Sequence, residues 1–170
     1  MGQSPIKFNF NLSNIMSLII KYSSFFGSSI FSIIFGILTL YVEIYTGLFY
    51  FTVLFFIYLI TAIIRYFYYK PRPDNLSKKN YTLLQSLSES SFPSAHIQRV
   101  MLISYTLILL NIWFIFIGLV ISLLVAYSRI FNKRHYWIDV FGGGVIVLIL
   151  LVFLASVWKT IPTYTLPFAT

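Results

Sequence analysis

Long apolar stretches with almost no charge among them constrain this chain more than any other feature. Lys, Arg, Asp and Glu make up 9% of the 170 residues, whereas 59% are hydrophobic. A soluble domain carries about 25% charged residues, so this chain has too few to cover a surface in water. At about 20 apolar residues per span, its length allows roughly four to six transmembrane helices. We therefore expect an all-α, polytopic membrane helical bundle that forms one domain over residues 1–170.

The hydropathy pattern divides the chain into five spans and one shorter segment. Residues 11–22 place apolar side chains at helical spacing but are too short and too polar to cross a bilayer, so they predict an interfacial helix. A Ser- and Gly-rich break follows at residues 23–29, and a turn is expected at 43–47. The bundle then has five spans, or six if the first segment also crosses: residues 31–42, 48–65, 94–110, 112–127 and 136–158.

Two smaller features complete this outline. The main polar stretch, residues 66–93, contains a segment at 78–87 that predicts a short amphipathic helix on the membrane surface. The triplet Gly142, Gly143 and Gly144 lies inside the last span, where close helix packing is its expected role. A phosphate-binding nest is less suitable there, because a nest needs irregular backbone at a helix start.

The formal net charge of +8 fits a membrane protein whose cations lie at the ends of its spans. We expect membrane lipids as partners and no nucleic acid, because the apolar content excludes a basic soluble chain. The chain has no cysteine, which excludes disulfides, thiolate metal ligands and Cys nucleophiles. The sequence does not define an oligomeric state.

Most polar side chains gather in three clusters, at residues 65–73, 93–96 and 128–139. They lie at the end of the second span, at the start of the third, and across the link between the fourth and fifth. Counting crossings places all three on the same side of the membrane. Both histidines of the chain and one of its four acidic residues belong to these clusters. This grouping predicts a site.

The residue types in the clusters suit phosphate chemistry. Several Arg side chains at one interface can bind a tetrahedral oxyanion through their guanidinium forks. His135 and Asp139 are four residues apart and share a helix face, so the carboxylate can hold one ring nitrogen and leave the other free to attack. His96 begins another helix and can protonate a leaving oxygen. Ser94 and the backbone N–H groups beside it add donors. Carboxylates are too few for a metal site, so no metal or other cofactor is expected.

These residues follow a pattern of order and spacing: Arg65-x6-Arg72-Pro73, then Pro93-Ser94-Ala95-His96, then Ser128-Arg129-x5-His135-x3-Asp139. The pattern resembles the three signature motifs of the type 2 phosphatidic acid phosphatase superfamily, Lys-x6-Arg-Pro, Pro-Ser-Gly-His and Ser-Arg-x5-His-x3-Asp. Arg65 replaces the usual Lys and keeps its charge. Ala95 replaces the usual Gly and can still donate its N–H to phosphate if its φ is negative.

The resemblance implies a function and a role for each motif residue. It implies an integral membrane phosphatase that forms a phosphohistidine on His135, oriented by Asp139, with His96 as acid for the leaving group and then base for water. It further implies that the phosphate is bound by Arg65, Arg72, Ser94, Ala95 and Arg129. The substrate is then a lipid phosphate or diphosphate, and a polyprenyl diphosphate of the undecaprenyl or dolichyl type is our first choice. Phosphatidic acid and phosphatidylglycerol phosphate are alternatives.

Two other functions remain open at this point. A non-catalytic lipid-phosphate carrier would use the same cations but would leave the two histidines without a role. A vanadate-type haloperoxidase would share the phosphate site, although the membrane setting argues against it.

The remaining polar residues are expected mainly in turns and at the membrane ends. Arg99, one turn past His96, is expected to face the site or the headgroup layer, because a charge inside a membrane is costly. Asp74 and Asn75 are expected in a turn after Pro73, and residues 66–69 in an interfacial aromatic belt. Membrane-end contacts with anionic lipids are the expected role of five further cations: Lys70, Lys78, Lys79, Lys133 and Arg134.

Two signals conflict on which side of the membrane the site faces. With five spans, 11 of the 12 Lys and Arg residues lie on the site's side, and the positive-inside rule would make that side cytoplasmic. Several of these cations, however, are assigned to phosphate. The same side carries three Asn-x-Ser/Thr sequons, at Asn11, Asn75 and Asn80. Since carrier-lipid phosphatases of the family commonly act on the outer face, we expect a cell-membrane protein with an extracytoplasmic site.

Overall fold

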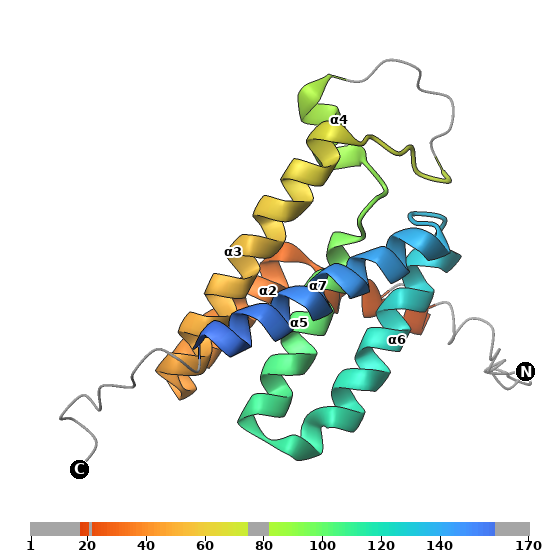
Figure 1. The fold of residues 1–170 in the computed structure, drawn as a ribbon. Coiled ribbons are helices and arrows are strands. Elements are labelled where there is room, and N and C mark those ends of the chain that lie inside the picture. The colour runs from red at the N-terminus through yellow and green to blue at the C-terminus, as the bar shows by residue number, and fades with distance from the viewer. Residues whose placement is uncertain (1–17, 21, 75–81, 159–170) are drawn as a thin grey trace, which may run out of the picture.

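The computed structural model describes residues 18–20, 22–74 and 82–158, and every regular element within these ranges is helical. Figure 1 shows the helices gathered into one bundle, with α5 inside it. In chain order the elements are η1 (Ser24–Gly27), α2 (Ser29–Val42), α3 (Ile44–Phe67), α4 (Leu83–Glu89), α5 (Ala95–Leu110), η2 (Ile112–Phe114), α6 (Ile115–Phe131) and α7 (Trp137–Trp158).

The lengths and apolar character of these helices confirm a membrane helical bundle. Three of the described helical segments are long and apolar enough to cross a membrane: α3, residues Ile112–Phe131 and α7. Leu18–Gly27 and α2 make a fourth candidate if this pair, bent by 56°, counts as one span. Helix α5 is apolar but has only 16 residues. Together these five pieces correspond to the five predicted spans.

Two predicted segments fall partly outside the described residues, and a predicted break in the chain is confirmed. Most of the predicted interfacial helix at 11–22 lies outside the described residues; its described part is helical and leads into η1. The predicted Ser-rich break is confirmed at Ser28, whose backbone is extended with ψ of 155°. Of the amphipathic helix predicted at 78–87, residues 78–81 lie outside the described ranges, and the observed α4 runs from Leu83 to Glu89.

The turn predicted at residues 43–47 is wrong in extent, because only Glu43 separates α2 from α3. The Glu43 carboxylate accepts hydrogen bonds from the N–H groups of Tyr45 and Thr46. Such an N-cap satisfies the free donors of the first helical turn, so α3 begins directly at Ile44.

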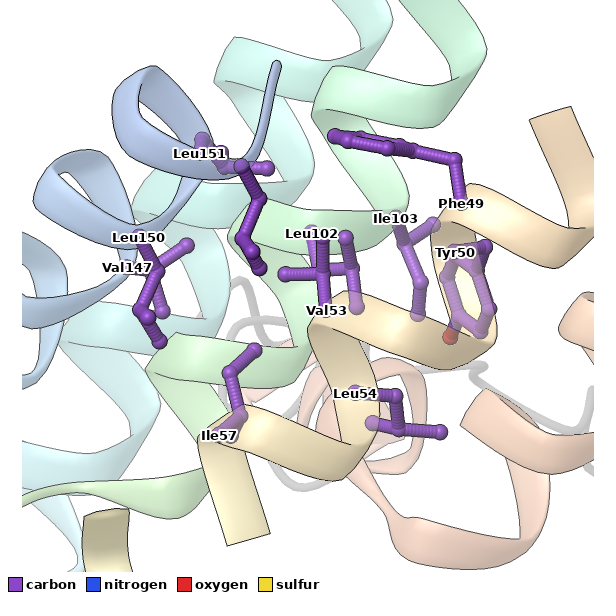
Figure 2. Close-up of a cluster of buried hydrophobic side chains, with 11 residues drawn as sticks. Phe49, Tyr50, Val53, Leu54, Ile57, Leu102, Ile103, Val147, Leu150 and Leu151 are labelled. Atoms are coloured by element: carbon purple, nitrogen blue, oxygen red, sulfur yellow. The ribbon is translucent and has the colours of Figure 1, made fainter. Parts of the chain in front are cut away.

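The main core lies between α3, α5 and α7 (Figure 2). Val53 and Ile57 of α3 pack against Leu102 of α5, and Val147 and Leu151 of α7 close the same cluster. Hydrogen bonds join the neighbouring helices: the Tyr50 hydroxyl donates to the Ser32 carbonyl of α2 at 2.9 Å, and Thr61 of α3 donates to Gln98 of α5 at 2.8 Å. Helix α5 is thereby fixed from several sides, and its first residues are held where α3 ends.

The glycine triplet of α7 brings that helix against the segment preceding α5. A Cβ on Gly143 would lie 2.9 Å from the Ser94 carbonyl oxygen, and one on Gly142 would lie 2.4 Å from the Phe92 ring. The predicted role of close packing is confirmed, since these positions leave no room for a side chain. The contact places the start of α5 beside the start of α7.

Candidate active site

The three polar clusters meet at one pocket of about 330 Å³. It lies where α3 ends, α5 begins and the link from α6 to α7 passes. Of the eight predicted site residues, six line it: Arg65, Arg72, Ala95, His96, Arg129 and His135. Arg99 lines it as well, so its predicted orientation toward the site is confirmed. No Asp or Glu is among the described residues of the wall, so the pocket presents four guanidinium groups and no carboxylate.

Arg65 and Arg72 are held by the segment between α4 and α5. Arg65 is the last buried residue of α3. It donates to two backbone carbonyls, that of Leu87 at 2.7 Å and that of Pro93 at 3.0 Å. Arg72 donates to the Ser88 carbonyl at 3.0 Å. The Nε atoms of both, like that of Arg129, are buried without a hydrogen-bond partner. Buried donors of this kind are costly unless an acceptor reaches them, which favours an anion in the pocket.

His135 lies in the link between α6 and α7, and its side chain is 3% exposed. Its Nδ1 is 2.6 Å from the carbonyl oxygen of Ser91. A carbonyl only accepts hydrogen bonds, so Nδ1 carries the proton and Nε2 keeps its lone pair. Burial lowers the pKa of His135 to about 3, and the positive charge of Arg129 acts in the same direction. The ring therefore stays neutral and nucleophilic well below pH 7.

Asp139 does not hold the ring of His135 in this structure. Its Oδ2 is 4.0 Å from His135 Nδ1, too far for a hydrogen bond, and accepts instead from the Tyr136 N–H at 2.8 Å. Its Oδ1 forms an ion pair with Lys70 Nζ at 2.6 Å. The fully buried carboxylate thus caps the start of α7 behind the pocket, and the Ser91 carbonyl orients the imidazole.

Sequence reasoning missed Lys70 and Ser91 as supporting residues. Lys70 was interpreted as a membrane-end cation, but its ammonium group contacts Asp139 and lies 4.5 Å from the centre of the Tyr136 ring. Its carbonyl also accepts from the Ser91 N–H at 2.8 Å. A signal for Lys70 existed in its position inside the first motif. None existed for Ser91, because every residue type offers the same carbonyl.

His96 and Arg99 share the first turns of α5. Arg99 Nε donates to the Gly27 carbonyl of η1 at 2.8 Å, and one terminal nitrogen of Arg99 lies 3.4 Å from His96 Nδ1. Since a guanidinium only donates, Nδ1 of His96 is the acceptor. In a neutral ring the single proton of His96 is then on Nε2.

Ser94 and Ala95 take different positions at the start of α5. Ala95 lines the pocket, and its φ is negative, since among the described non-glycine residues only Lys133 has a positive φ. Ser94 is not on the wall: it is fully buried, its Oγ has no hydrogen-bond partner, and its N–H donates to the Asp139 carbonyl at 3.0 Å. Ser94 therefore connects the start of α5 to α7 without lining the pocket.

Other predicted residues lie around the rim. Arg134 pairs with Asp74 at 3.0 Å, so it has a protein partner rather than only lipid. The Asp74 N–H donates to the Lys133 carbonyl at 3.2 Å, which joins the turn after Pro73 to the α6–α7 link. Lys78, Lys79 and Asn75 lie outside the described residues. Within the described ranges, no three His, Asp or Glu side chains are close enough to hold one metal ion.

Comparison with known proteins gives the family. The sequence model of the PAP2 superfamily matches residues 46–162, a range that contains all three motifs. The chain belongs to the PAP2 superfamily. This confirms the resemblance drawn from the motifs.

Two known proteins are similar to this PAP2 chain. Undecaprenyl-diphosphatase BcrC of Bacillus subtilis (strain 168) is 32% identical over 93 residues, which are 55% of this chain and 46% of BcrC. The chain thus matches about half the length of that relative. A crystal structure described as the first transmembrane PAP2 type phosphatidylglycerolphosphate phosphatase from Bacillus subtilis superposes with a TM-score of 0.64. It covers 94% of this chain and 82% of that chain at 23% identity, which supports the fold alone.

Proposed function

We propose that this protein is a membrane phosphatase that hydrolyses a lipid phosphate or diphosphate through a phosphohistidine intermediate. The observation that carries this proposal is a buried, neutral His135 with Nε2 unengaged, facing a pocket whose wall contributes four arginines and no carboxylate. A cationic pocket alone suits binding. A cationic pocket with a desolvated nucleophile suits phosphoryl transfer.

The proposed reaction has two steps. His135 Nε2 attacks the terminal phosphorus while Arg65, Arg72 and Arg129 neutralise its oxygens, and the bond from phosphorus to the leaving oxygen breaks. His96 stands beside that oxygen as its proton donor. In the second step His96 takes a proton from water, and the water oxygen attacks the phosphorus. The bond from phosphorus to His135 Nε2 breaks, which releases phosphate and free His135. All charge stabilisation comes from side chains, so the proposed reaction needs no metal.

Several features support a lipid substrate with a small headgroup. The pocket wall includes Tyr58, Thr61 and Ala62 of α3, a helix long and apolar enough to cross a membrane, so part of the wall comes from a membrane-spanning segment. Among lipid substrates we propose a polyprenyl diphosphate first, in agreement with the similarity to undecaprenyl-diphosphatase BcrC. Phosphatidylglycerol phosphate is the second candidate, named for the structural match. Phosphatidic acid is the third.

We further propose that the protein lies in the cell membrane with its site on the extracytoplasmic face. A polyprenyl carrier phosphatase acting there would recycle carrier lipid after its glycan has been released. In the sequence, the link between the second and third predicted spans carries sequons at Asn75 and Asn80, which an outward-facing loop could carry.

The direct test is release of phosphate by purified protein in detergent without added metal. Undecaprenyl diphosphate, phosphatidylglycerol phosphate and phosphatidic acid are compared at equal concentration, with and without EDTA. We expect undecaprenyl diphosphate to be hydrolysed fastest and EDTA to have no effect. Absence of turnover on all three substrates would reject the function, and strong inhibition by EDTA would reject the metal-free mechanism.

A carrier function is the alternative from another class, and one variant separates it from the enzyme. His135→Ala removes the nucleophile while keeping every arginine, so turnover should fall by at least ~10³-fold. Phosphate binding should persist. Turnover near the wild-type rate in His135→Ala would remove His135 from the proposed role.

A further inference from the structure

Arg99 is a buried cation that the proposed reaction does not use. Its side chain is 4% exposed, and it lies one helical turn further into α5 than His96. A charge inside a membrane helix is expensive and normally has a specific partner. The family motifs end at His96 on this helix, so they assign nothing to Arg99.

The contacts of Arg99 leave its charge unmatched. Its Nε donates to the Gly27 carbonyl, a terminal nitrogen approaches His96, and the guanidinium carbon lies 5.9 Å from the centre of the Tyr58 ring. None of these three groups is a carboxylate. The carboxylates of Asp139 and Asp74 pair with Lys70 and Arg134. A buried guanidinium without a counter-charge is stable only if a ligand supplies one.

The order of groups along the pocket gives the place of that ligand charge. On one part of the wall, Arg129 comes from the last turn of α6 and His135 from the link between α6 and α7. On another part, His96 comes from the first turn of α5 and Arg99 from the second. Tyr58 and Thr61 of α3 line the same pocket, and the centre of the Tyr58 ring lies 5.9 Å from the guanidinium carbon of Arg99. A substrate attacked by His135 would therefore have its leaving group beside His96 and the next group of its chain beside Arg99.

We propose that Arg99 binds the phosphate that leaves with the lipid, and so selects lipid diphosphates over lipid phosphomonoesters. This inference rests on the proposed function and deepens it by naming the substrate class. In a diphosphate, the group next to the attacked terminal phosphate is a second anionic phosphate, which matches Arg99. In a monoester, the group at the same place is an alkyl chain, which leaves Arg99 unpaired.

The chemistry of the leaving group agrees with this assignment. The bond from His135 Nε2 to the terminal phosphorus forms as the bond from that phosphorus to the bridging oxygen breaks, and the electron pair leaves on the lipid phosphate. Arg99 neutralises this charge by donating hydrogen bonds, so departure of the lipid phosphate depends less on a proton from His96 than departure of an alkoxide does. An alkoxide leaving group needs a proton from His96.

The test compares two substrates that differ by one phosphate, farnesyl diphosphate and farnesyl monophosphate, with wild type and Arg99→Gln. We expect kcat/KM on the diphosphate to fall about 10- to 100-fold, the size of a lost charge-assisted bond, and kcat/KM on the monophosphate to change less than about threefold. Arg99→Lys should recover part of the preference for the diphosphate. An equal loss on both substrates would overturn the assignment and make Arg99 a structural residue of η1.

A matched control addresses the contact with η1. Ser24→Ala removes the 2.6 Å hydrogen bond between Ser24 and Ser128, which ties η1 to α6, and removes no charge from the pocket. Any effect of loosening η1 should then be equal on the two substrates. A shift of preference in Ser24→Ala as large as that in Arg99→Gln would contradict the proposal.

A binding measurement separates failure of this inference from failure of the proposed function. If the wild type hydrolyses neither substrate, the phosphatase proposal is rejected, and the affinity for methylenediphosphonate is compared with that for orthophosphate. Arg99→Gln should weaken binding of the diphosphonate by at least ~10-fold more than binding of orthophosphate. Equal weakening of both ligands would overturn the second phosphate site.

Discussion

At the residue scale, the buried carboxylate of Asp139 depends on Lys70 for its counter-charge. The two groups are 2.6 Å apart, and the Asp139 side chain is fully buried. Removing one partner of a buried pair leaves an unpaired charge and costs about 3–5 kcal/mol, whereas removing both costs much less. We expect Lys70→Met to lower the midpoint of thermal unfolding in detergent strongly.

The double variant Lys70→Met/Asp139→Asn provides the control for this prediction, because it removes both charges. It should be more stable than Lys70→Met alone. If the effects of the two substitutions on the unfolding midpoint were additive, the ion pair would contribute nothing to the stability of the start of α7.

The low pKa of His135 predicts a dependence of stability on pH. Burial lowers it from 6.5 to about 3, so between these values the unfolded chain binds a proton that the folded protein excludes. Stability then falls as pH decreases through this window and rises as pH increases, with a slope of up to about 1.4 kcal/mol per pH unit for one group. Unfolding midpoints of wild type and His135→Gln, measured at about pH 7 and pH 5, should converge at the lower pH. Parallel shifts in both proteins would show that His135 does not titrate as inferred.

At the element scale, the site depends on how closely α7 approaches the segment before α5. A Cβ on Gly143 would lie 2.9 Å from the Ser94 carbonyl oxygen and 3.2 Å from its nitrogen, and backbone cannot move away as a side chain can. We expect Gly143→Ala to separate the two elements, to cost about 1–3 kcal/mol, and to lower turnover at least ~10-fold.

Gly144→Ala is the matched control, because its Cβ would meet only the flexible side chain of Met101, at 3.3 Å from the sulfur. Its turnover should stay within about twofold of wild type. Similar losses in the two variants would show that the close approach at Ser94 does not position the site.

The elements and the grouping of the motifs could be predicted from sequence, whereas the contacts behind the pocket could not. Alternation of apolar spans and polar links places residues 65–73, 93–96 and 128–139 on one side, and the structure brings six of the eight predicted side chains to one pocket. The hydrogen bond from His135 to Ser91 uses a backbone carbonyl, a group that every residue has, so the sequence does not indicate it. Ser94 is fully buried away from the pocket wall, and its backbone packs against Gly143 of α7, a tertiary contact without a local signal in the sequence.

Boundaries between helices show a similar division. Hydropathy is averaged over a window, so it spread the turn between the first two spans over residues 43–47. A single N-cap at Glu43 is enough to end α2 and begin α3. The usual N-cap residues are Ser, Thr, Asp and Asn, so the cap residues of the sequence do not point to Glu43 as the boundary.

At the scale of the whole molecule, the cations at one end of the bundle are of two kinds, and only one kind bears on how the protein is oriented in the membrane. The pocket requires Arg65, Arg72, Arg99 and Arg129 wherever it faces, whereas rim cations such as Arg134 would favour a cytoplasmic side. Because much of the charge has a chemical purpose, the positive-inside rule loses its weight for this chain, and orientation has to be measured.

Cysteine labelling can make that measurement, since the chain has no cysteine of its own. Ser88 is exposed on α4 at the pocket end, and Tyr41, 92% exposed near the end of α2, lies at the opposite end of the bundle. For an extracytoplasmic site, a membrane-impermeant thiol reagent added to intact cells should label Ser88→Cys. It should label Tyr41→Cys only after the cells are broken, because that end then faces the cytoplasm. The reverse pattern would place the pocket in the cytoplasm and would exclude recycling of a carrier lipid at the outer surface.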